Sequence, residues 1–322
     1  MDRARHVDTR GRRGALVATV AGALAAAALL AVTVAAPTPA PPPVASLLLY
    51  PPTPAPAPTS PSPSPCPTVN GFDCTWAARL ATATALVDAA PGQLGVILID
   101  RATGARFTAG ATGTATWAGS TVKLGMAALV LDTSGGPDGL APADRVDLAA
   151  MLAVSDDDAA SRVWERHGGR AMLGELRARY GMSGLAISGS NGNWGAMTCT
   201  PGDLAALMVH VLDRAAPAVR DYLVDAMRHV GDIQRWGVWA AGPALAPGVK
   251  NSWLENPYGG AAHWNTSTIG FAGPAERWVV AVMYQMPAGT DGSLALGVHT
   301  VSDLVAVLLG APTPAPVTVR PT

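Results

Sequence analysis

Hydrophobic and polar positions divide this chain of 322 residues into four segments. Residues 1–36 hold an arginine-rich start followed by a largely apolar run, and residues 37–68 are rich in proline, mostly with alanine, serine and threonine between. Residues 69–310 carry the periodic patterns of secondary structure, and residues 311–322 are expected to form a disordered tail. We therefore predict one folded domain, long enough to bury a complete hydrophobic core.

Alternating side chains predict a sheet in the second half of this domain. Residues 277–285 alternate two sets of apolar side chains, which is the period of a β-strand. Residues 264–271 predict a second strand, and a turn-rich stretch at residues 256–260 separates it from the segment around Lys250. Lys250 is therefore expected on a strand of an antiparallel sheet.

An apolar stretch at residues 123–131 predicts a helix that begins with the motif Ser120-Thr121-Val122-Lys123. Because side chains three residues apart share one face of a helix, Ser120 and Lys123 are expected to be neighbours. A serine hydroxyl becomes a nucleophile when a base removes its proton, and a lysine can be that base when burial or a second cation lowers its pKa. The plain alternative is a serine that caps the helix, followed by a surface lysine.

Lysine usage favours the catalytic interpretation. Lys123 and Lys250 are the only lysines among 22 basic residues. Arginine does not lose its proton in proteins, so a chain that otherwise uses arginine keeps lysine where a neutral amine is required. High genomic GC content also depletes lysine, but it does not explain which two positions retain it. Lys250 could be the second cation beside Lys123, and it could also bind the carboxylate of an acidic substrate.

Two further short motifs have both a catalytic and a structural interpretation. The first is the run Ser155-Asp156-Asp157-Asp158. It precedes an apolar-periodic segment, where a serine cap and an acidic first turn stabilise a helix, although a serine there can also direct its hydroxyl into a cleft. The second is the run Val249-Lys250-Asn251-Ser252-Trp253. By itself this predicted strand carries almost no functional signal.

In this order the three motifs resemble those of the penicillin-recognising serine enzymes, most closely the class A β-lactamase family, whose hallmarks are Ser-x-x-Lys, Ser-Asp-Asn and Lys-Thr-Gly. The resemblance covers residues 74–309. It includes a β-hairpin with strands at residues 94–99 and 106–109, a threonine-proline-led helix at 198–212 and a closing helix at 297–309. It implies an α/β fold, an α+β sandwich of the β-lactamase/transpeptidase type, with an antiparallel sheet flanked by helices and a helical subdomain.

The resemblance also implies roles for individual residues. Ser120 would be the acylated nucleophile, Lys123 its base and Ser155 the proton relay toward the leaving group. Lys250 would bind the substrate carboxylate. The substrate-binding positions would be Lys250, Asp157, Asn251, Ser252 and Trp253. The backbone amides of Ser120 and Trp253 would form the oxyanion hole, provided that the Trp253 side chain points away from the cleft.

Three positions depart from the family pattern. Asp157 replaces an asparagine, and an ionised carboxylate cannot donate a hydrogen bond to a substrate carbonyl. Ser252 replaces a glycine beside the ligand and adds bulk. Residues 181–200, where the family carries a glutamate that activates the deacylating water, contain no carboxylate, and Asp203 is the nearest acid that follows.

These departures leave three functions open. The first is an exported serine hydrolase that transfers acyl groups through Ser120, with Lys123 as base, on β-lactams or peptidoglycan-type amides and esters. The second is a penicillin-binding D,D-peptidase-like enzyme with slow deacylation, which the missing loop carboxylate favours. The third is a catalytically inactive cell-envelope binding module, which the changes at Asp157 and Ser252 favour and the retention of both lysines disfavours.

The N-terminal segments predict export. Five arginines within residues 1–13 precede the apolar run at residues 14–36, a pattern typical of a signal anchor or a signal peptide. The run is long enough to span a bilayer, and the arginines would remain cytoplasmic, so we expect an anchored protein facing the extracellular side, or a secreted one if the leader is cleaved. No cysteine follows the run directly, which disfavours a lipoprotein. The proline-rich linker would hold the domain away from the membrane.

Cysteines, charge and composition add further constraints. Cys66 and Cys74 could form a disulfide in an oxidising compartment, which would leave Cys199 as a buried free thiol. The net charge of −1 and the lack of a basic cluster outside the leader argue against nucleic-acid binding. No metal-ligand spacing is present, so we expect no metal and no other cofactor. The expected partner is a small molecule, and the expected oligomeric state is a monomer.

Overall fold

The computed structural model describes residues 66–189, 192–255, 262–288 and 293–319. The predicted leader and almost all of the predicted linker therefore lie outside the described residues. Within the described ranges, no helix has the length and apolar character needed to cross a bilayer.

Helices and strands follow one another in groups along the described chain. The α-helices are α1 (Ala77–Ala89), α2 (Val122–Thr133), α3 (Pro142–Ala153), α4 (Asp157–Arg166), α5 (Ala171–Tyr180), α6 (Pro201–Asp213), α7 (Pro217–Arg228) and α8 (Leu294–Leu309). The strands are β1 (Gln93–Asp100), β2 (Arg106–Gly110), β3 (Thr116–Trp117), β4 (Ala186–Ile187), β5 (Met197–Cys199), β6 (Gly248–Glu255), β7 (Trp264–Ala272) and β8 (Trp278–Gln285). Short 3₁₀ helices that matter for the site are η2 (Gly119–Thr121), η4 (Trp194–Ala196), η5 (Asp232–Gln234) and η6 (Gly237–Ala241).

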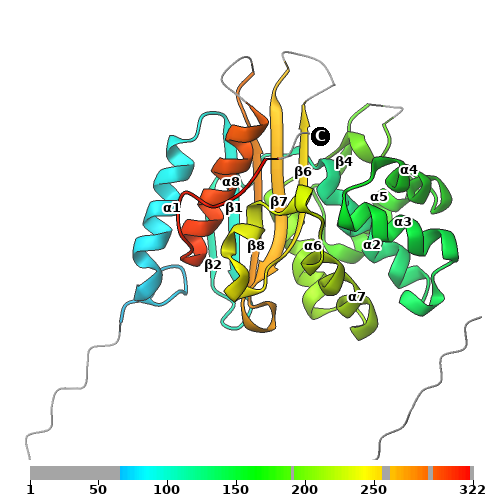
Figure 1. Ribbon diagram of the computed structural model, residues 1–322, viewed down its shortest axis with the longest axis horizontal. Helices are drawn as coiled ribbons and strands as arrows, with labels where there is room; N and C mark the ends of the chain where they lie inside the picture. Colours follow the sequence, from blue (N-terminus) through cyan, green and yellow to red (C-terminus); the bar gives the residue numbers. More distant parts are fainter. Residues whose placement is uncertain (1–65, 190–191, 256–261, 289–292, 320–322) are drawn as a thin grey trace, which may run out of the picture. The chain divides into compact units, whose positions relative to one another are not determined.

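Five strands form one antiparallel sheet in the order β2-β1-β8-β7-β6. Helices α1 and α8 cover one face of this sheet, and the region from α2 to α7 lies on its other side (Figure 1). A second sheet, β3-β5-β4, has three short strands. The predicted antiparallel sheet, the flanking helices and the helical subdomain are thus confirmed, and β6, which carries Lys250, is an edge strand of the large sheet.

Strand alternation gives each face of the sheet its own hydrophobic core. In β8, Val280 and Val282 pack in the core shared with α1 and α8. Their neighbours Val279 and Ala281 pack in the core shared with the helical subdomain. Because successive side chains of a strand point to opposite faces, the alternation seen in the sequence becomes two cores separated by one sheet.

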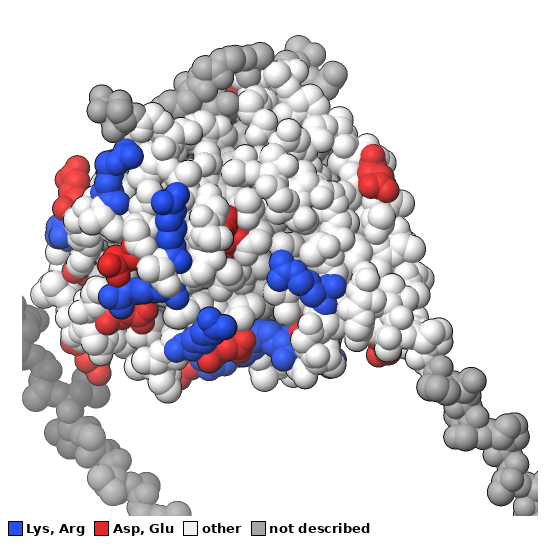
Figure 2. Space-filling model, turned by 180° about the vertical axis from the view of Figure 1, so that it is seen from behind, with Lys and Arg blue, Asp and Glu red and all other residues white. Residues whose placement is uncertain are grey.

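Helix α2 is enclosed by the helical subdomain, because every residue from position 122 to position 131 is buried. A helix that is apolar all round is stable only inside a core. Charged residues instead join the surface helices: Arg166 of α4 donates to Asp144 of α3 at 2.8 Å and to Asp147 at 2.6 Å. On the face seen in Figure 2, basic and acidic side chains likewise lie beside one another in mixed clusters.

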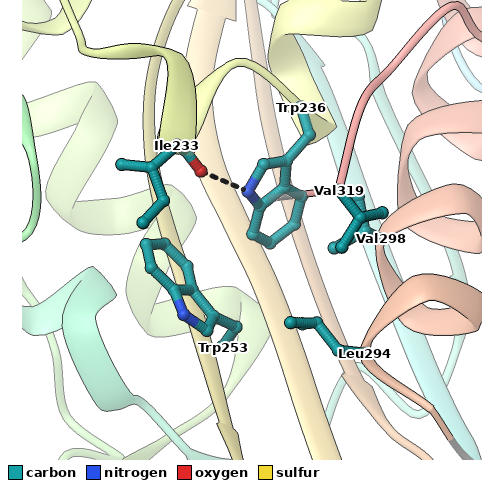
Figure 3. Close-up of a pocket in the computed structure, with 6 residues that line it drawn as sticks. All are labelled: Ile233, Trp236, Trp253, Leu294, Val298 and Val319. Atoms are coloured by element: carbon teal, nitrogen blue, oxygen red, sulfur yellow. Dashed lines mark hydrogen bonds between the residues drawn. The ribbon is translucent and has the colours of Figure 1, made fainter. Parts of the chain in front are cut away.

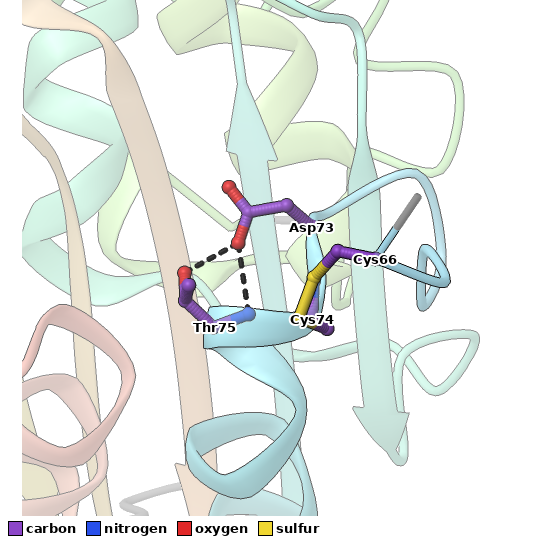
Figure 4. The surroundings of a disulfide bond; sticks show 4 residues. All are labelled: Cys66, Asp73, Cys74 and Thr75. Carbon is purple, nitrogen blue, oxygen red and sulfur yellow. Dashed lines mark hydrogen bonds between the residues drawn. A yellow bond between two sulfur atoms is a disulfide. The ribbon is translucent and has the colours of Figure 1, made fainter. Parts of the chain in front are cut away.

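A disulfide between Cys66 and Cys74 fastens the start of the described chain to the first helical turn, with their Cα atoms 5.6 Å apart (Figure 4). Between them Asp73 caps this turn, since its carboxylate accepts a hydrogen bond from the Thr75 amide at 2.9 Å. Cys199 is buried and unpaired, and burial raises the pKa of its thiol well above the usual value. Such a thiol is unreactive, which fits a core residue.

The prediction of a disordered tail at residues 311–322 is wrong for residues 311–319. Ala315 is buried, and its backbone amide donates to Asp303 of α8 at 2.6 Å. Ala315 also packs against Ala306 of the same helix. One hydrogen bond to Asp303 and one apolar contact with Ala306 therefore hold residues 311–319 against α8, although their composition predicts disorder.

Candidate active site

Ser120 borders a cleft of about 270 Å³ at the junction of the sheet edge and the helical subdomain. It lies in η2, directly before α2, and its side chain is partly exposed. The residues that line this cleft are Gly119, Ser120, Asp157, Asn193, Trp194, Gly195, Trp253, Leu254 and Glu255. Neither lysine belongs to this lining, although both lie close behind it.

Lys123 is completely buried, one turn along α2 from Ser120. Its ammonium donates to Asp157 Oδ1 at 2.5 Å, to the Ser155 carbonyl at 2.6 Å and to Ser155 Oγ at 3.3 Å. It also lies 4.7 Å from the ring centroid of Trp194, a cation–π contact. These three acceptors match the three N–H donors of a charged lysine, and the Asp157 carboxylate is in position to be its counter-ion.

Ser155 joins α3 to α4 in a left-handed backbone conformation, with φ of 65°. The residue that caps α4 is Asp156, whose side chain accepts from the Ala159 amide at 2.7 Å, so the alternative in which Ser155 is the cap is wrong. The Ser155 hydroxyl is thereby left to contact both Lys123 and Lys250 Nζ, the latter at 3.0 Å. A non-glycine residue at positive φ costs free energy, and such positions gather at functional sites.

Lys250 is also completely buried. Besides Ser155 Oγ, its Nζ atom contacts Gln234 Oε1 at 2.7 Å and the Asn251 carbonyl at 3.0 Å. In this structure Lys250 therefore does not line the cleft, and its binding of a substrate carboxylate stays a prediction. We call Lys123, Ser155 and Lys250 the proton network.

The physical environment lowers the pKa of both lysines. Burial is the main cause for each, and for Lys123 the hydrogen bond and charge of Asp157 oppose it. For Lys250 the charge of Lys123 adds to burial, and the pKa falls well below the usual lysine value. Two protonation patterns satisfy every contact, because the Ser155 hydroxyl can accept from one lysine and donate to the other: Lys123 is charged and Lys250 neutral, or the reverse. The stronger lowering of the pKa of Lys250 and the carboxylate of Asp157 beside Lys123 favour the first pattern.

Gln234 is a member of the site that the sequence did not reveal. It is buried in η5, donates to the carbonyls of Leu152 at 2.6 Å and Ala153 at 2.9 Å, and presents its carbonyl oxygen to Lys250. This amide links α3 to the lysine on β6. The only local signal was one neutral polar residue in a stretch of mostly apolar and aromatic residues, and no short motif marks it.

Asn251 is buried and does not line the cleft either, so its binding of substrate stays a prediction. Its Nδ2 atom donates to the carbonyls of Gln234 at 2.8 Å and Trp236 at 3.1 Å, and its Oδ1 atom accepts from Thr268 at 2.6 Å. Successive residues of a strand point to opposite faces, so a lysine directed toward Ser155 leaves its neighbour on the other side. Asn251 fastens η5 and η6 to the sheet.

The next two residues of β6 differ in the same way. Ser252 points toward η2, where its Oγ atom accepts a hydrogen bond from the Ser120 amide at 3.0 Å. Trp253 borders the cleft, but its indole ring packs near Trp236, with ring centroids 6.2 Å apart, in a small apolar pocket that Ile233 and Leu294 also line (Figure 3). The ring thus lies beside Ile233 and Trp236 in that pocket.

Carboxylates near the cleft have distinct positions. The Asp157 side chain is 73% exposed and paired with Lys123. Residues 193–195 line the cleft without a carboxylate. Asp203 serves structure instead: its Oδ2 atom accepts from the Thr200 amide and hydroxyl at 2.8 Å each, and its Oδ1 atom accepts from the Gly184 amide at 2.8 Å. Asp203 is therefore engaged in a capping box and does not replace the missing glutamate.

Sequence comparison finds relatives of this chain in two mycobacterial species. Proteins named "Putative lipoprotein LppW" in Mycobacterium tuberculosis and Mycobacterium bovis are 31% identical to this chain over 220 residues, which are 65% of this chain and 68% of each relative. The chain belongs to the LppW family. No protein-family model matches it.

Comparison with solved structures identifies the fold of this LppW-family chain. An ancestral class A β-lactamase named GNCA covers 72% of this chain and 99% of its own length, with a TM-score of 0.57 and 21% identity. The class A β-lactamase of the last common ancestor of Gram-negative bacteria, GNCA4, gives a TM-score of 0.56 with 22% identity, over 72% of this chain and 98% of its own. These likenesses confirm that this LppW-family chain has the class A β-lactamase fold.

Proposed function

We propose that this protein transfers acyl groups through a covalent ester on Ser120. As the Ser120 oxygen attacks the substrate carbonyl carbon, a neutral Lys123 takes the hydroxyl proton, and Ser155 passes a proton to the leaving nitrogen or oxygen. Water then cleaves the ester and releases the acid. The observation that carries this proposal is that the two lysines of the chain are both buried and both contact the hydroxyl of Ser155.

Burial of the lysines supports this function over a purely structural one. A lysine that only followed a helix cap would extend into solvent, where its ammonium is hydrated. Enclosing two amines beside one hydroxyl lowers both pKa values and disfavours two simultaneous charges. A proton can then move between Lys123 and Lys250 through Ser155, which leaves Lys123 neutral for the attack.

Release of the acyl group is the slow step of the proposed reaction. The described residues around the cleft offer Asp157 and Glu255, and Asp157 is already the counter-ion of Lys123. This absence of a loop carboxylate favours a second candidate function, a penicillin-binding D,D-peptidase-like enzyme that deacylates slowly. Both candidates share the acyl-enzyme on Ser120.

The substrates that we propose are β-lactams or peptidoglycan-type amides and esters, because the structures of like fold are named β-lactamases. We also propose export, with residues 14–36 as signal or anchor and residues 37–68 as linker, which agrees with the name lipoprotein of the LppW relatives. The first cysteine of the chain, Cys66, is bonded to Cys74, so its sulfur is not free to carry a lipid. The N-terminal apolar run is then the membrane contact.

The test is incubation of the full chain, in detergent, with a fluorescent reporter β-lactam, followed by turnover and intact mass beside Ser120→Ala. Turnover that Ser120→Ala abolishes supports a β-lactamase. A stable mass increase that is absent from Ser120→Ala supports the slowly deacylating enzyme. If neither variant acquires mass or turns over the reporter, β-lactams are excluded, and failure to react with a fluorophosphonate as well would favour a non-catalytic binding module.

A further inference from the structure

The Ser120 amide, which an acyl-enzyme needs for its oxyanion, already has a hydrogen-bond acceptor. Ser252 Oγ lies 3.0 Å from the Ser120 nitrogen, and Ser252 is only 1% exposed. A backbone amide has one N–H, so a bond to Ser252 occupies it. This contact joins β6 to η2, directly beside the proposed nucleophile.

Gly119 provides the space for this contact. A Cβ atom at Gly119 would lie 2.1 Å from Ser252 Oγ and 2.5 Å from the Leu254 side chain, far inside van der Waals contact. Gly119 also has a φ of 47°, a conformation that side chains disfavour. The absence of a side chain at Gly119 therefore leaves room for the Ser252 hydroxyl. The hydrogen bond between Ser252 and the Ser120 amide is thus part of the packing of η2 against β6.

The same space is required for acyl transfer. When Ser120 attacks a carbonyl, negative charge develops on the carbonyl oxygen, and amides preorganised 2.7–3.1 Å away stabilise it, as a general rule. The Ser120 amide is one of the two that the family resemblance implies. A substrate oxygen must therefore displace the Ser252 hydroxyl, or it must react with one amide fewer.

We propose that Ser252 is a positioning residue that occupies the oxyanion site in the resting protein and must turn aside before Ser120 is acylated. This inference rests on the proposed acyl transfer through Ser120. The hydroxyl gives up one neutral hydrogen bond when it moves, which is worth about 1 kcal/mol, or about a fivefold change in rate. The Ser252 hydroxyl therefore slows acylation about fivefold, and a variant without this hydroxyl should acylate faster by the same factor.

The test compares the full chain with Ser252→Ala and Ser252→Gly by two measurements. The first is the second-order rate at which a fluorophosphonate labels Ser120, and we expect about a fivefold increase in both variants. The second is amide hydrogen exchange in the peptide that contains Ser120, which we expect to accelerate in both. Ser267→Ala is the matched control, because Ser267 is equally buried and directly opposite Ser252 on β7. It should change neither quantity.

The outcomes separate this inference from the proposed function. Faster exchange with faster labelling supports both. Faster exchange with no labelling of any variant, including the parent chain, supports the contact between Ser252 and the Ser120 amide and removes acyl transfer. Labelling of Ser252→Ala at the parent rate or below, in a variant whose melting temperature shows that it is folded, overturns the inference whatever the exchange shows.

Discussion

The two sides of the candidate site are built differently. The proton network of Lys123, Ser155 and Lys250 is buried, and each member contacts another within 3.3 Å. The substrate side, which we define as Asp157, Ser252 and residues 193–195, departs from the class A β-lactamase motifs at Asp157 and Ser252 and offers no loop carboxylate. The two lysines and Ser155 thus form one enclosed cluster, whereas the departures from the class A β-lactamase motifs lie on the cleft side.

In the proposed function, proton transfer and substrate binding therefore rely on separate parts of the fold. The network draws its residues from α2, the α3–α4 junction and β6, all held by cores on either side of the sheet edge. The substrate side consists of single side chains and a loop. If the proposed acyl transfer holds, a substitution there should alter which acyl compounds react while the lysines remain enclosed.

The largest expected effect comes from removing the base. Lys123→Arg keeps a positive charge beside Asp157 but cannot accept a proton at neutral pH, so labelling of Ser120 by a fluorophosphonate should slow by about 100-fold or more. Lys123→Met is the matched variant without charge, and it should be equally slow. Circular dichroism confirms that each variant is folded. Parent-like labelling of Lys123→Arg would rule out Lys123 as the base.

A second prediction concerns stability and pH at Lys250. Burial lowers the folded-state pKa of Lys250 below its unfolded value of about 10.5, so the unfolded state binds more protons between these two values. The free energy of unfolding should therefore rise with pH across this window. Lys250→Met should flatten the rise, and chemical denaturation followed by tryptophan fluorescence at several pH values measures it. An equally steep rise in Lys250→Met would contradict a buried lysine of lowered pKa.

The smallest expected effect concerns Asp157, which lies on the substrate side of the site. Asp157 raises the pKa of Lys123 through its hydrogen bond and charge, against the larger effect of burial. Asp157→Asn should lower this pKa further, so the pH at which Ser120 labelling reaches half its maximum rate should move to lower pH. Asp158→Asn, an exposed neighbour, is the control and should leave the profile in place. A shift to higher pH, or none, would show that the ion pair does not govern the base.

Much of the fold was predictable because its signals are local. Alternation at residues 264–271 and 277–285 predicted β7 and β8 to within one residue at each end. The apolar stretch at residues 123–131 marked α2 by its length, since a helix enclosed on all sides has no amphipathic period. The family motifs added the topology, which the comparisons confirm.

The parts of the site that sequence did not predict depend on contacts between distant segments. Gln234 approaches Lys250 only because η5 packs beside β6, and a lone glutamine carries no periodic signal. The directions of Asn251 and Ser252 follow from strand alternation once the side that Lys250 faces is known, and the sequence alone does not fix that side. Residues 311–319 were missed because one backbone amide and one buried alanine hold them, which composition does not record.

The most direct test of the central claim is to react the full chain with a fluorophosphonate and locate the adduct by peptide mass spectrometry. A hydroxyl activated by the proton network should give one adduct, on the peptide that contains Ser120, and Ser120→Ala should give none. Equal labelling of Ser120→Ala, or an adduct on another residue, would contradict the claim that Ser120 is the nucleophile of this site.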